Sequence, residues 1–231
     1  MHEHREPDWF EAVVPALLLV LPGALVLQVL QGLGAVPSGP TGGDGWIELY
    51  MALQGLNCVL VLAWMLVRRR DLRSGNPALL RTVGLYAGLL IIWVPVMIGY
   101  LRLLELITSL EPQSHLEYFA DVDFTRPGLW VGVAVAVFLG PLAEEVVFRG
   151  YLYGVAERSF GSRRALLLTS GLFGLIHGLD FAIPLALLGL LFGWLRQRSG
   201  GLSAPVLVHA TYNAITVSVV VLFPRVIDWI Y

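Results

Sequence analysis

The sequence predicts an all-α membrane protein, a polytopic bundle of about seven transmembrane helices. Of its 231 residues, 57% are hydrophobic and only 14% are charged, and the mean hydropathy is +0.74. Soluble domains carry about 25% charged residues, so we expect this chain to lie in a lipid bilayer. The net charge of -2 gives no reason to expect a nucleic-acid partner.

Seven apolar stretches are predicted to form the spans, because a spanning helix needs about 20 apolar residues. The fifth and sixth are short, and Gly178 and Pro184 mark a tight turn between them. Short helices are tolerated where they line a water-filled cavity. The predicted spans are 13–33, 46–67, 79–101, 128–155, 165–179, 181–195 and 202–223.

The arginines predict the orientation of the bundle. Eleven of the 15 basic residues fall on the same side as the N-terminus, and only three fall on the other side. The positive-inside rule therefore places the N-terminus in the cytoplasm. We divide the chain into an N-terminal three-span region, 1–127, and a four-helix core, 128–231, which holds nearly all the ionisable groups predicted to be buried.

Three polar clusters interrupt the apolar spans of this core. A charge inside a membrane is costly and usually functional. From a helical rise of about 1.5 Å per residue, the first two clusters lie roughly 18 Å from the cytoplasmic ends of their helices and the third roughly 10 Å. We therefore expect the clusters to meet within the bilayer. They are Glu144, Glu145 and Arg149 in the fourth span, Phe173 and His177 in the fifth, and His209 and Asn213 in the seventh.

The spacing within the first cluster separates its two carboxylates. Glu145 and Arg149 are four residues apart, so they share a helix face and are predicted to form a buried ion pair. Glu144 is turned about 140° away from Arg149 at 100° per residue. It is free to face a cavity, where a carboxylate can act as a general base. Pro141 can kink this helix and make room for water.

The second and third clusters supply the other groups that such a site needs. His209 and Asn213 share one helix face, and side-chain donors of this kind can stabilise an oxyanion. Phe173 lies one turn before His177 and is predicted to form a wall beside it. Taken singly, each histidine also fits a structural hydrogen-bonding role, and Phe173 fits simple packing.

In sequence order, these clusters resemble the EExxxR, FxxxH and HxxxN motifs of the type II CAAX prenyl endopeptidase and bacteriocin-processing family, also called CPBP or Abi. The resemblance covers residues 128–223. It implies an intramembrane glutamate endopeptidase in which Glu144 activates water with help from His177, and His209 and Asn213 form the oxyanion site. Glu145 and Arg149 would hold the geometry, although the family also leaves room for a direct role of Glu145.

The resemblance further implies a bacterial member in the inner membrane, with a site accessible from the cytoplasmic half. Its substrate would be a peptide or protein with a membrane-associated segment, and prenylated substrates are not expected. No cofactor is expected either.

Two other interpretations use the same residues. A zinc-dependent metalloprotease could ligate the metal with the glutamate and histidine cluster, although the HExxH spacing is absent and Arg149 disfavours a dication. Cys58 is the only cysteine, which excludes a Cys-rich metal site. A non-enzymatic membrane protein of the immunity, binding or transport type is the second alternative, but we find no internal repeat typical of transporters.

Overall fold

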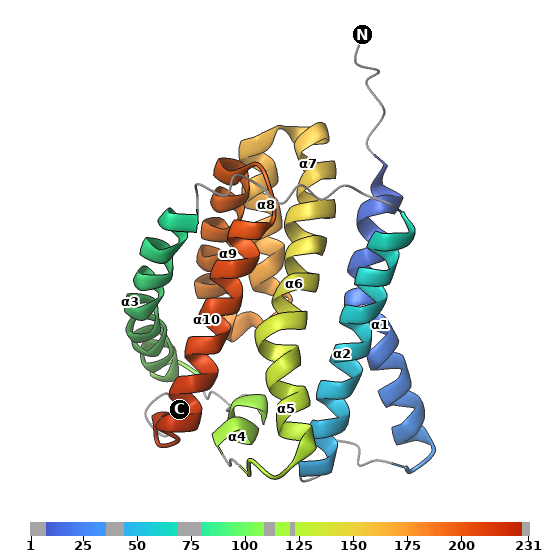
Figure 1. The fold of residues 1–231 in the computed structure, drawn as a ribbon, viewed down its shortest axis with the longest axis vertical. Coiled ribbons are helices and arrows are strands. Elements are labelled where there is room, and N and C mark those ends of the chain that lie inside the picture. The colour runs from blue at the N-terminus through green and yellow to red at the C-terminus, as the bar shows by residue number, and fades with distance from the viewer. Residues whose placement is uncertain (1–7, 36–43, 69–79, 109–113, 121–122, 228–231) are drawn as a thin grey trace.

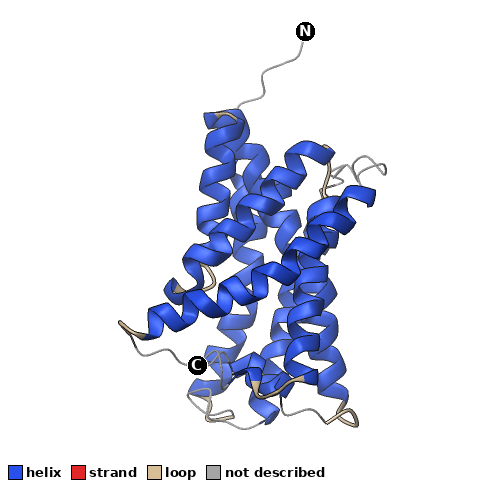
Figure 2. Ribbon diagram, turned by 90° about the vertical axis from the view of Figure 1, so that its left-hand side faces the viewer, coloured by secondary structure: helices blue, strands red, loops and turns tan. Residues whose placement is uncertain are grey.

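The computed structural model describes residues 8–35, 44–68, 80–108, 114–120 and 123–227. Every regular element in these ranges is a helix, as Figures 1 and 2 show. The all-α prediction is therefore confirmed. Most of the helices run along one common direction and form a bundle.

The first two long helices form an antiparallel hairpin joined by a polar contact. They are α1 (Trp9–Gly32) and α2 (Asp44–Val67). The buried Asn57 accepts a hydrogen bond of 2.8 Å from the backbone N–H of Gly23 and donates one of 2.8 Å to Gln54. A Cβ on Gly23 would lie 3.0 Å from Asn57 Nδ2, so the glycine permits this close approach.

The next two helices are α3 (Leu80–Glu105) and the short helix α4 (Ser114–Ala120). α3 packs along α10 and touches α9, at one side of the molecule (Figure 1). α4 buries Tyr118 and Phe119 in a cluster that also contains residues of α2 and of the following helix.

A single long helix, Pro127–Phe160, passes through the centre of the bundle. It consists of α5 (Pro127–Ala134), the π-helical segment η2 (Val135–Leu139), α6 (Gly140–Glu145), a second π-helical segment η3 (Val146–Leu152) and α7 (Tyr153–Phe160). The segments η2 and η3 flank the helix that carries the two glutamates. Such π-helical segments are frequent at functional sites.

Three helices follow: α8 (Ser162–Leu175), α9 (Leu179–Ser199) and α10 (Ser203–Leu222). α8 has 14 residues, which is about 21 Å at 1.5 Å per residue, and a bilayer core is about 30 Å thick. The turn after α8 therefore lies within the bundle, as the short fifth span predicted. Gly178, with φ of 97°, adopts a conformation that favours glycine and lies in the predicted turn. The prediction was wrong for Pro184, which lies inside α9 because the helix already begins at Leu179.

The contact between α8 and α9 depends on small residues. A Cβ on Gly174 would overlap the carbonyl oxygen of Ala182 and would lie 2.9 Å from the Cβ of Ala186. The two helix backbones thus approach each other closely, as is common where helices pack in membranes. This packing fixes the position of the turn that carries His177.

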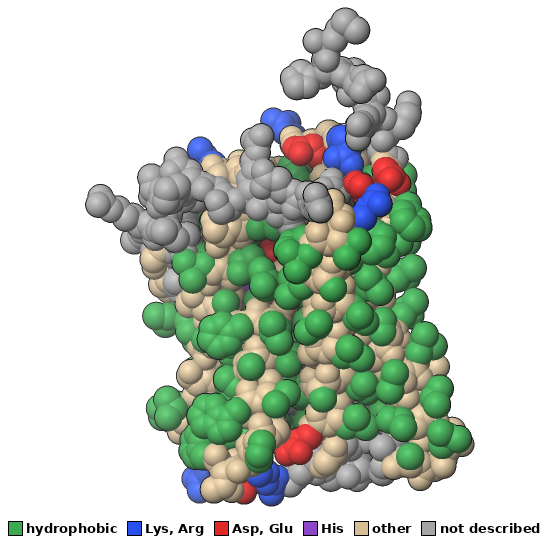
Figure 3. All heavy atoms as spheres, turned by 45° about the vertical axis from the view of Figure 1, so that its right-hand side comes forward, with side chains coloured by type: hydrophobic (Ala, Val, Ile, Leu, Met, Phe, Trp, Pro, Cys, Tyr) green, Lys and Arg blue, Asp and Glu red, His purple; other side chains and the backbone are tan. Residues whose placement is uncertain are grey.

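The surface of the bundle fits a membrane environment. Hydrophobic side chains cover its middle, and charged side chains gather at the two ends (Figure 3). Among the described residues, five helical stretches are long and apolar enough to cross a membrane. They are Trp9–Gly32, Ile47–Val67, Pro127–Phe160, Leu179–Ser199 and Ser203–Leu222.

The two other predicted spans correspond to α3 and α8, and α8 is too short to cross. The number of crossings and the cytoplasmic N-terminus therefore stay predictions. So does the division at residue 127. Residues of α1 and α2 share one buried cluster with η3, α8, α9 and α10, so the first helices directly support the core that holds the polar clusters.

Candidate active site

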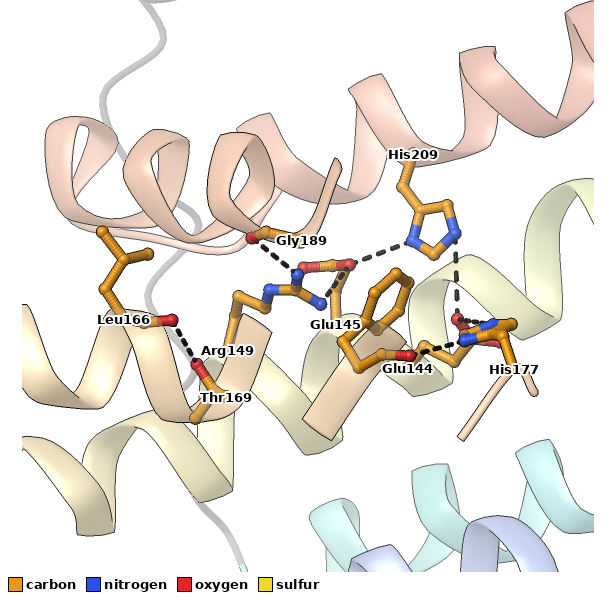
Figure 4. Close-up of polar contacts among 9 residues, drawn as sticks. Glu144, Glu145, Arg149, Leu166, Thr169, His177, Gly189 and His209 are labelled. Carbon is orange, nitrogen blue, oxygen red and sulfur yellow. Dashed lines mark hydrogen bonds and ion pairs between the residues drawn. The ribbon is translucent and has the colours of Figure 1, made fainter. Parts of the chain in front are cut away.

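Six of the seven site residues predicted from the sequence meet in the centre of the bundle, whereas the hydrogen bond of Asn213 is with the backbone of the central helix. Figure 4 shows Glu144, Glu145 and Arg149 on the long central helix, facing His209 from α10 and His177 from the turn after α8. Phe173, on the last turn of α8, contacts several of these side chains. The fold therefore brings together residues that lie up to 65 positions apart in the chain, as the 144 to 209 separation shows.

Glu145 and Arg149 form the predicted ion pair. Arg149 Nη1 lies 3.0 Å from Glu145 Oε1, and both side chains are fully buried. Arg149 Nη2 also donates a hydrogen bond of 2.9 Å to the carbonyl oxygen of Gly189. Its guanidinium carbon lies 4.6 Å from the ring centroid of Phe173 and 5.3 Å from that of Phe192. A buried charge is tolerated when it is paired and hydrogen-bonded in this way.

Gly189 leaves the space that the guanidinium occupies. A Cβ at this position would lie 3.2 Å from Arg149 Nη2 and 3.3 Å from Phe173 Cδ1. Both distances are tighter than ordinary van der Waals contact. We infer that glycine at position 189 lets α9 approach the ion pair closely enough for its backbone carbonyl to accept a hydrogen bond.

His209 lies between the Glu145–Arg149 ion pair and Glu144. Its Nδ1 lies 2.9 Å from Glu145 Oε1, and an ionised carboxylate can only accept, so Nδ1 carries the proton. The imidazole stacks on Phe192, with ring centroids 4.6 Å apart and an interplanar angle of 20°. With Nδ1 engaged, Nε2 is directed to Glu144, and it lies 3.8 Å from Glu144 Oε2.

His177 is held in a similar way from the opposite side. Its Nδ1 lies 2.6 Å from the carbonyl oxygen of Phe173, which again assigns the proton to Nδ1. Its Nε2 lies 4.0 Å from Glu144 Oε2. The side chain is 30% exposed, whereas that of His209 is 5% exposed. His177 therefore sits at the more open edge of the cluster.

Glu144 lies between the two imidazoles. Its Oε2 atom is buried and has no hydrogen-bond partner within the described chain. The distances of 3.8 and 4.0 Å to the two Nε2 atoms exceed those of direct hydrogen bonds. Its side chain is 23% exposed, in contrast to the fully buried Glu145. The two adjacent glutamates therefore differ: the carboxylate of Glu145 is held in an ion pair, and that of Glu144 faces the Nε2 atoms of two imidazoles.

Phe173 packs at the centre of this arrangement. It is almost completely buried, and its ring centroid lies 4.7 Å from that of His177 and 5.7 Å from that of His209. It also meets Phe148 edge to face at 5.3 Å. Its backbone orients one histidine and its ring supports the other, which extends its predicted place as a wall beside His177.

Asn213 lies one turn beyond His209 on α10, and its hydrogen bond leads to the backbone of the central helix. Its Nδ2 donates to the carbonyl oxygen of Ala136 over 2.7 Å. The side chain is half-buried. This acceptor was not predicted, because Ala136 is one alanine in an apolar run and carries no sequence signal. Gly189 and Phe192 were missed for the same reason.

The cluster was also considered as a metal site. Within the residues that the structure describes, no group of three or more His, Cys, Asp and Glu side chains is arranged to hold a metal ion. The sequence offered zinc at this cluster only as an alternative, and the described geometry adds no support for it.

Comparison with known protein families finds a match over the part of the chain that contains this cluster. Residues 126–215 match the family described as type II CAAX prenyl endopeptidase Rce1-like. This range contains all seven site residues named above, so the resemblance that the three motifs indicate is confirmed. The chain is thus an integral membrane protein with an Rce1-like region around its central polar cluster.

A curated relative matches the chain over a similar length. The protein named "Putative membrane peptidase YdiL" of Bacillus subtilis (strain 168) is 27% identical over 86 residues, which is 37% of this chain and 35% of that relative. The alignment therefore spans about a third of the relative's length. No solved structure matches the chain.

Proposed function

We propose that this protein is an intramembrane endopeptidase that hydrolyses a peptide bond in a membrane-associated peptide or protein. The observation that carries the proposal is the position of Glu144 Oε2. This atom has no hydrogen-bond partner among the described residues, and it faces the Nε2 atoms of His177 and His209 at 4.0 and 3.8 Å. The Rce1-like match and the name of the Bacillus relative support the same class of reaction.

In this proposal, a water molecule binds between Glu144 Oε2 and the two imidazoles. The separations suit a water that bridges the groups at ordinary hydrogen-bond lengths of about 2.8 Å. Glu144 takes a proton from this water while the water oxygen attacks the carbonyl carbon of the substrate. General-base assistance of this type contributes about 10² to 10⁴-fold to a rate.

The remaining steps return the proton to the substrate. When the carbon–nitrogen bond of the tetrahedral intermediate breaks, the protonated Glu144 donates its proton to the leaving amine. His177 Nε2, with its Nδ1–H committed to the Phe173 carbonyl, accepts a hydrogen bond from the attacking water and orients it. No cofactor is needed in this scheme.

The negative charge on the intermediate would be stabilised by His209 and Asn213. Because His209 already donates from Nδ1 to Glu145, its Nε2 can donate as well only as an imidazolium. Asn213 has two N–H donors on its amide, and Ala136 uses one of them, which leaves the other for the oxyanion.

Glu145 and Arg149 support this site without taking part in proton transfer. The carboxylate of Glu145 is fully buried and bound by both Arg149 and His209. It fixes the tautomer and the direction of His209, much as a carboxylate orients a histidine in other hydrolytic sites.

We also propose that substrate reaches the site from the cytoplasmic half of a bacterial inner membrane. The end of the bundle where α7 meets α8 and where α9 ends carries several arginines, as cytoplasmic ends do. They are Arg158, Arg163, Arg164, Arg196 and Arg198.

The proposal is tested by peptide-library cleavage with purified protein in detergent and excess chelator. We expect the wild type to cleave and Glu144→Gln to lose at least 10²-fold in rate while it remains folded. Glu105→Gln, at an exposed ion pair, is the matched control and should be fully active. Activity lost in chelator and restored by zinc would favour the metalloprotease, and full activity of Glu144→Gln would contradict the assigned base.

A further inference from the structure

Pro141 leaves one backbone carbonyl of the central helix without a helical partner. It is the second residue of α6, three positions before Glu144. In an α-helix the carbonyl of residue 136 accepts from the N–H of residue 140, and in a π-helix from that of residue 141. Here the N–H of Gly140 donates to the oxygen of Val135, and proline has no N–H to give.

The oxygen of Ala136 is therefore free to accept from outside its own helix. A buried carbonyl without a partner is costly, especially where no bulk water can reach it. Asn213 of α10 supplies the missing donor at 2.7 Å. The assignment of the amide is unambiguous, because a carbonyl oxygen can only accept and the atom that faces it must be the nitrogen.

This hydrogen bond orients the whole amide group of Asn213. The side-chain amide is planar, so fixing one N–H direction also fixes that of the second. The bond is placed two turns before Glu144 on one helix and one turn after His209 on the other. It therefore joins the central helix, which carries Glu144, to α10, which carries His209.

We propose that Pro141 is a positioning residue that acts through Asn213. Because proline has no backbone N–H, the Ala136 carbonyl stays available to accept from Asn213. This hydrogen bond sets the direction of the second Asn213 N–H, which serves the reaction. The role of the second Asn213 N–H in the reaction rests on the function proposed above. The claim that Pro141 leaves the Ala136 carbonyl to Asn213 does not. Any residue other than proline at position 141 would supply an N–H that competes with Asn213 for the same carbonyl.

The hydrogen-bond exchange can be observed without substrate. The chain contains only three asparagines, Asn57, Asn76 and Asn213, so selective ¹⁵N-asparagine labelling gives three side-chain amide signals, and Asn213→Ala identifies one of them. In Pro141→Ala, we expect the Asn213 signals to shift and one of its amide protons to exchange with solvent at least tenfold faster. The Asn57 signals should not move.

Pro22→Ala provides the matched control, because Pro22 lies inside α1, on a different helix from both Ala136 and Asn213. It also gains an N–H, yet it should leave the Asn213 signals in place. If Pro141→Ala does not fold, Pro141→Ser introduces the same N–H and carries the test. Asn213 signals that are unchanged in the folded variant would overturn the inference.

The effect on the reaction is a separate measurement. Pro141→Ala should lower kcat at least tenfold with KM within twofold of wild type, because the amide direction matters to the intermediate more than to bound substrate. An unchanged kcat, with an active wild type, would overturn the positioning role while the proposed function stood. A wild type that cleaves no peptide would instead refute the proposed function. The amide signals alone would then decide whether Pro141 determines the orientation of the Asn213 side-chain amide.

Discussion

Replacing Arg149 with methionine removes a buried charge while it keeps much of the side-chain volume. The guanidinium is fully buried, lies 3.0 Å from Glu145 Oε1 and donates to the Gly189 carbonyl over 2.9 Å. Breaking such a pair on one side leaves an uncompensated buried carboxylate, which costs about 3–5 kcal/mol. For a chain of this size each 1 kcal/mol shifts Tm by about 2–4 °C, so we expect a loss of roughly 6–20 °C.

The assay is thermal unfolding of the purified variants in detergent, followed by circular dichroism. Arg102→Met is the matched control. Arg102 pairs with Glu105 at 2.8 Å, but both side chains are more than a third exposed, and exposed pairs contribute only about 0–1 kcal/mol. Its Tm should therefore fall by a few degrees at most.

A double variant separates the charge from the packing. Glu145→Gln added to Arg149→Met removes the unpaired carboxylate, so the double variant should recover a large part of the lost Tm. If Arg149→Met were no less stable than Arg102→Met, or if the double variant unfolded at the temperature of the single one, the buried-pair reasoning would be wrong.

Two further outcomes test other parts of the fold. Gly174→Ala should strongly lower the folded yield and the Tm, because its Cβ would overlap the Ala182 carbonyl of α9. Gly171→Ala is the control, because a Cβ at position 171 would meet no other atom within 4 Å. Equal stability of the two variants would contradict the α8–α9 contact. Thr125→Val should raise the pKa of Asp123, which hydrogen bonds from Thr125 hold below its ordinary value. A carboxyl titration by NMR measures this shift, and an unchanged pKa would mean that Thr125 is not the cause.

The sign of the Asp123 effect follows from its lowered pKa. A carboxyl group whose pKa is lowered by folding stabilises the folded state above its ordinary pKa of about 3.9, and this stabilisation is lost as the pH falls through the folded value. The Thr125→Val variant should therefore show a weaker dependence of stability on pH in the acid range. Because 43% of the Asp123 side chain is exposed to solvent, which screens its interactions, the change should be small.

Much of the site geometry could be predicted because it follows from helical periodicity. The spacing of four between Glu145 and Arg149 predicted an ion pair, and the pair is present. The same rule predicted that Glu144 points away from Arg149. In the structure, Glu144 faces His177 and His209. The helical rise predicted overlapping depths for Glu144, His177 and His209. In the structure, Nε2 of each histidine lies within 4.0 Å of Glu144 Oε2.

The rest of the site could not be predicted because it depends on departures from that periodicity. The partner of Asn213 is a carbonyl freed by the π-helical segment η2 and by Pro141, and a change of helical register leaves no pattern in an apolar run. Pro141 was predicted to kink the helix, but its effect on Ala136 required the structure. Gly189 and Phe192 act through contacts between helices that only tertiary packing defines.

The ends of the membrane helices also could not be predicted from the apolar pattern alone. The stretch 165–179 was predicted as a short span, and the observed helix α8 ends at Leu175 with His177 in the turn that follows. Apolar composition identified the segment, whereas the end of the helix is set by Gly178 with its positive φ and by the close packing of α8 on α9.

An experimental structure of the wild type at a resolution that places ordered water tests the central claim most directly. We expect one water within about 2.6–3.2 Å of Glu144 Oε2 and of at least one of the two imidazole Nε2 atoms. A Glu144 side chain directed toward the acyl chains, or bonded directly to Arg149 with no water beside it, would contradict the proposed hydrolytic site.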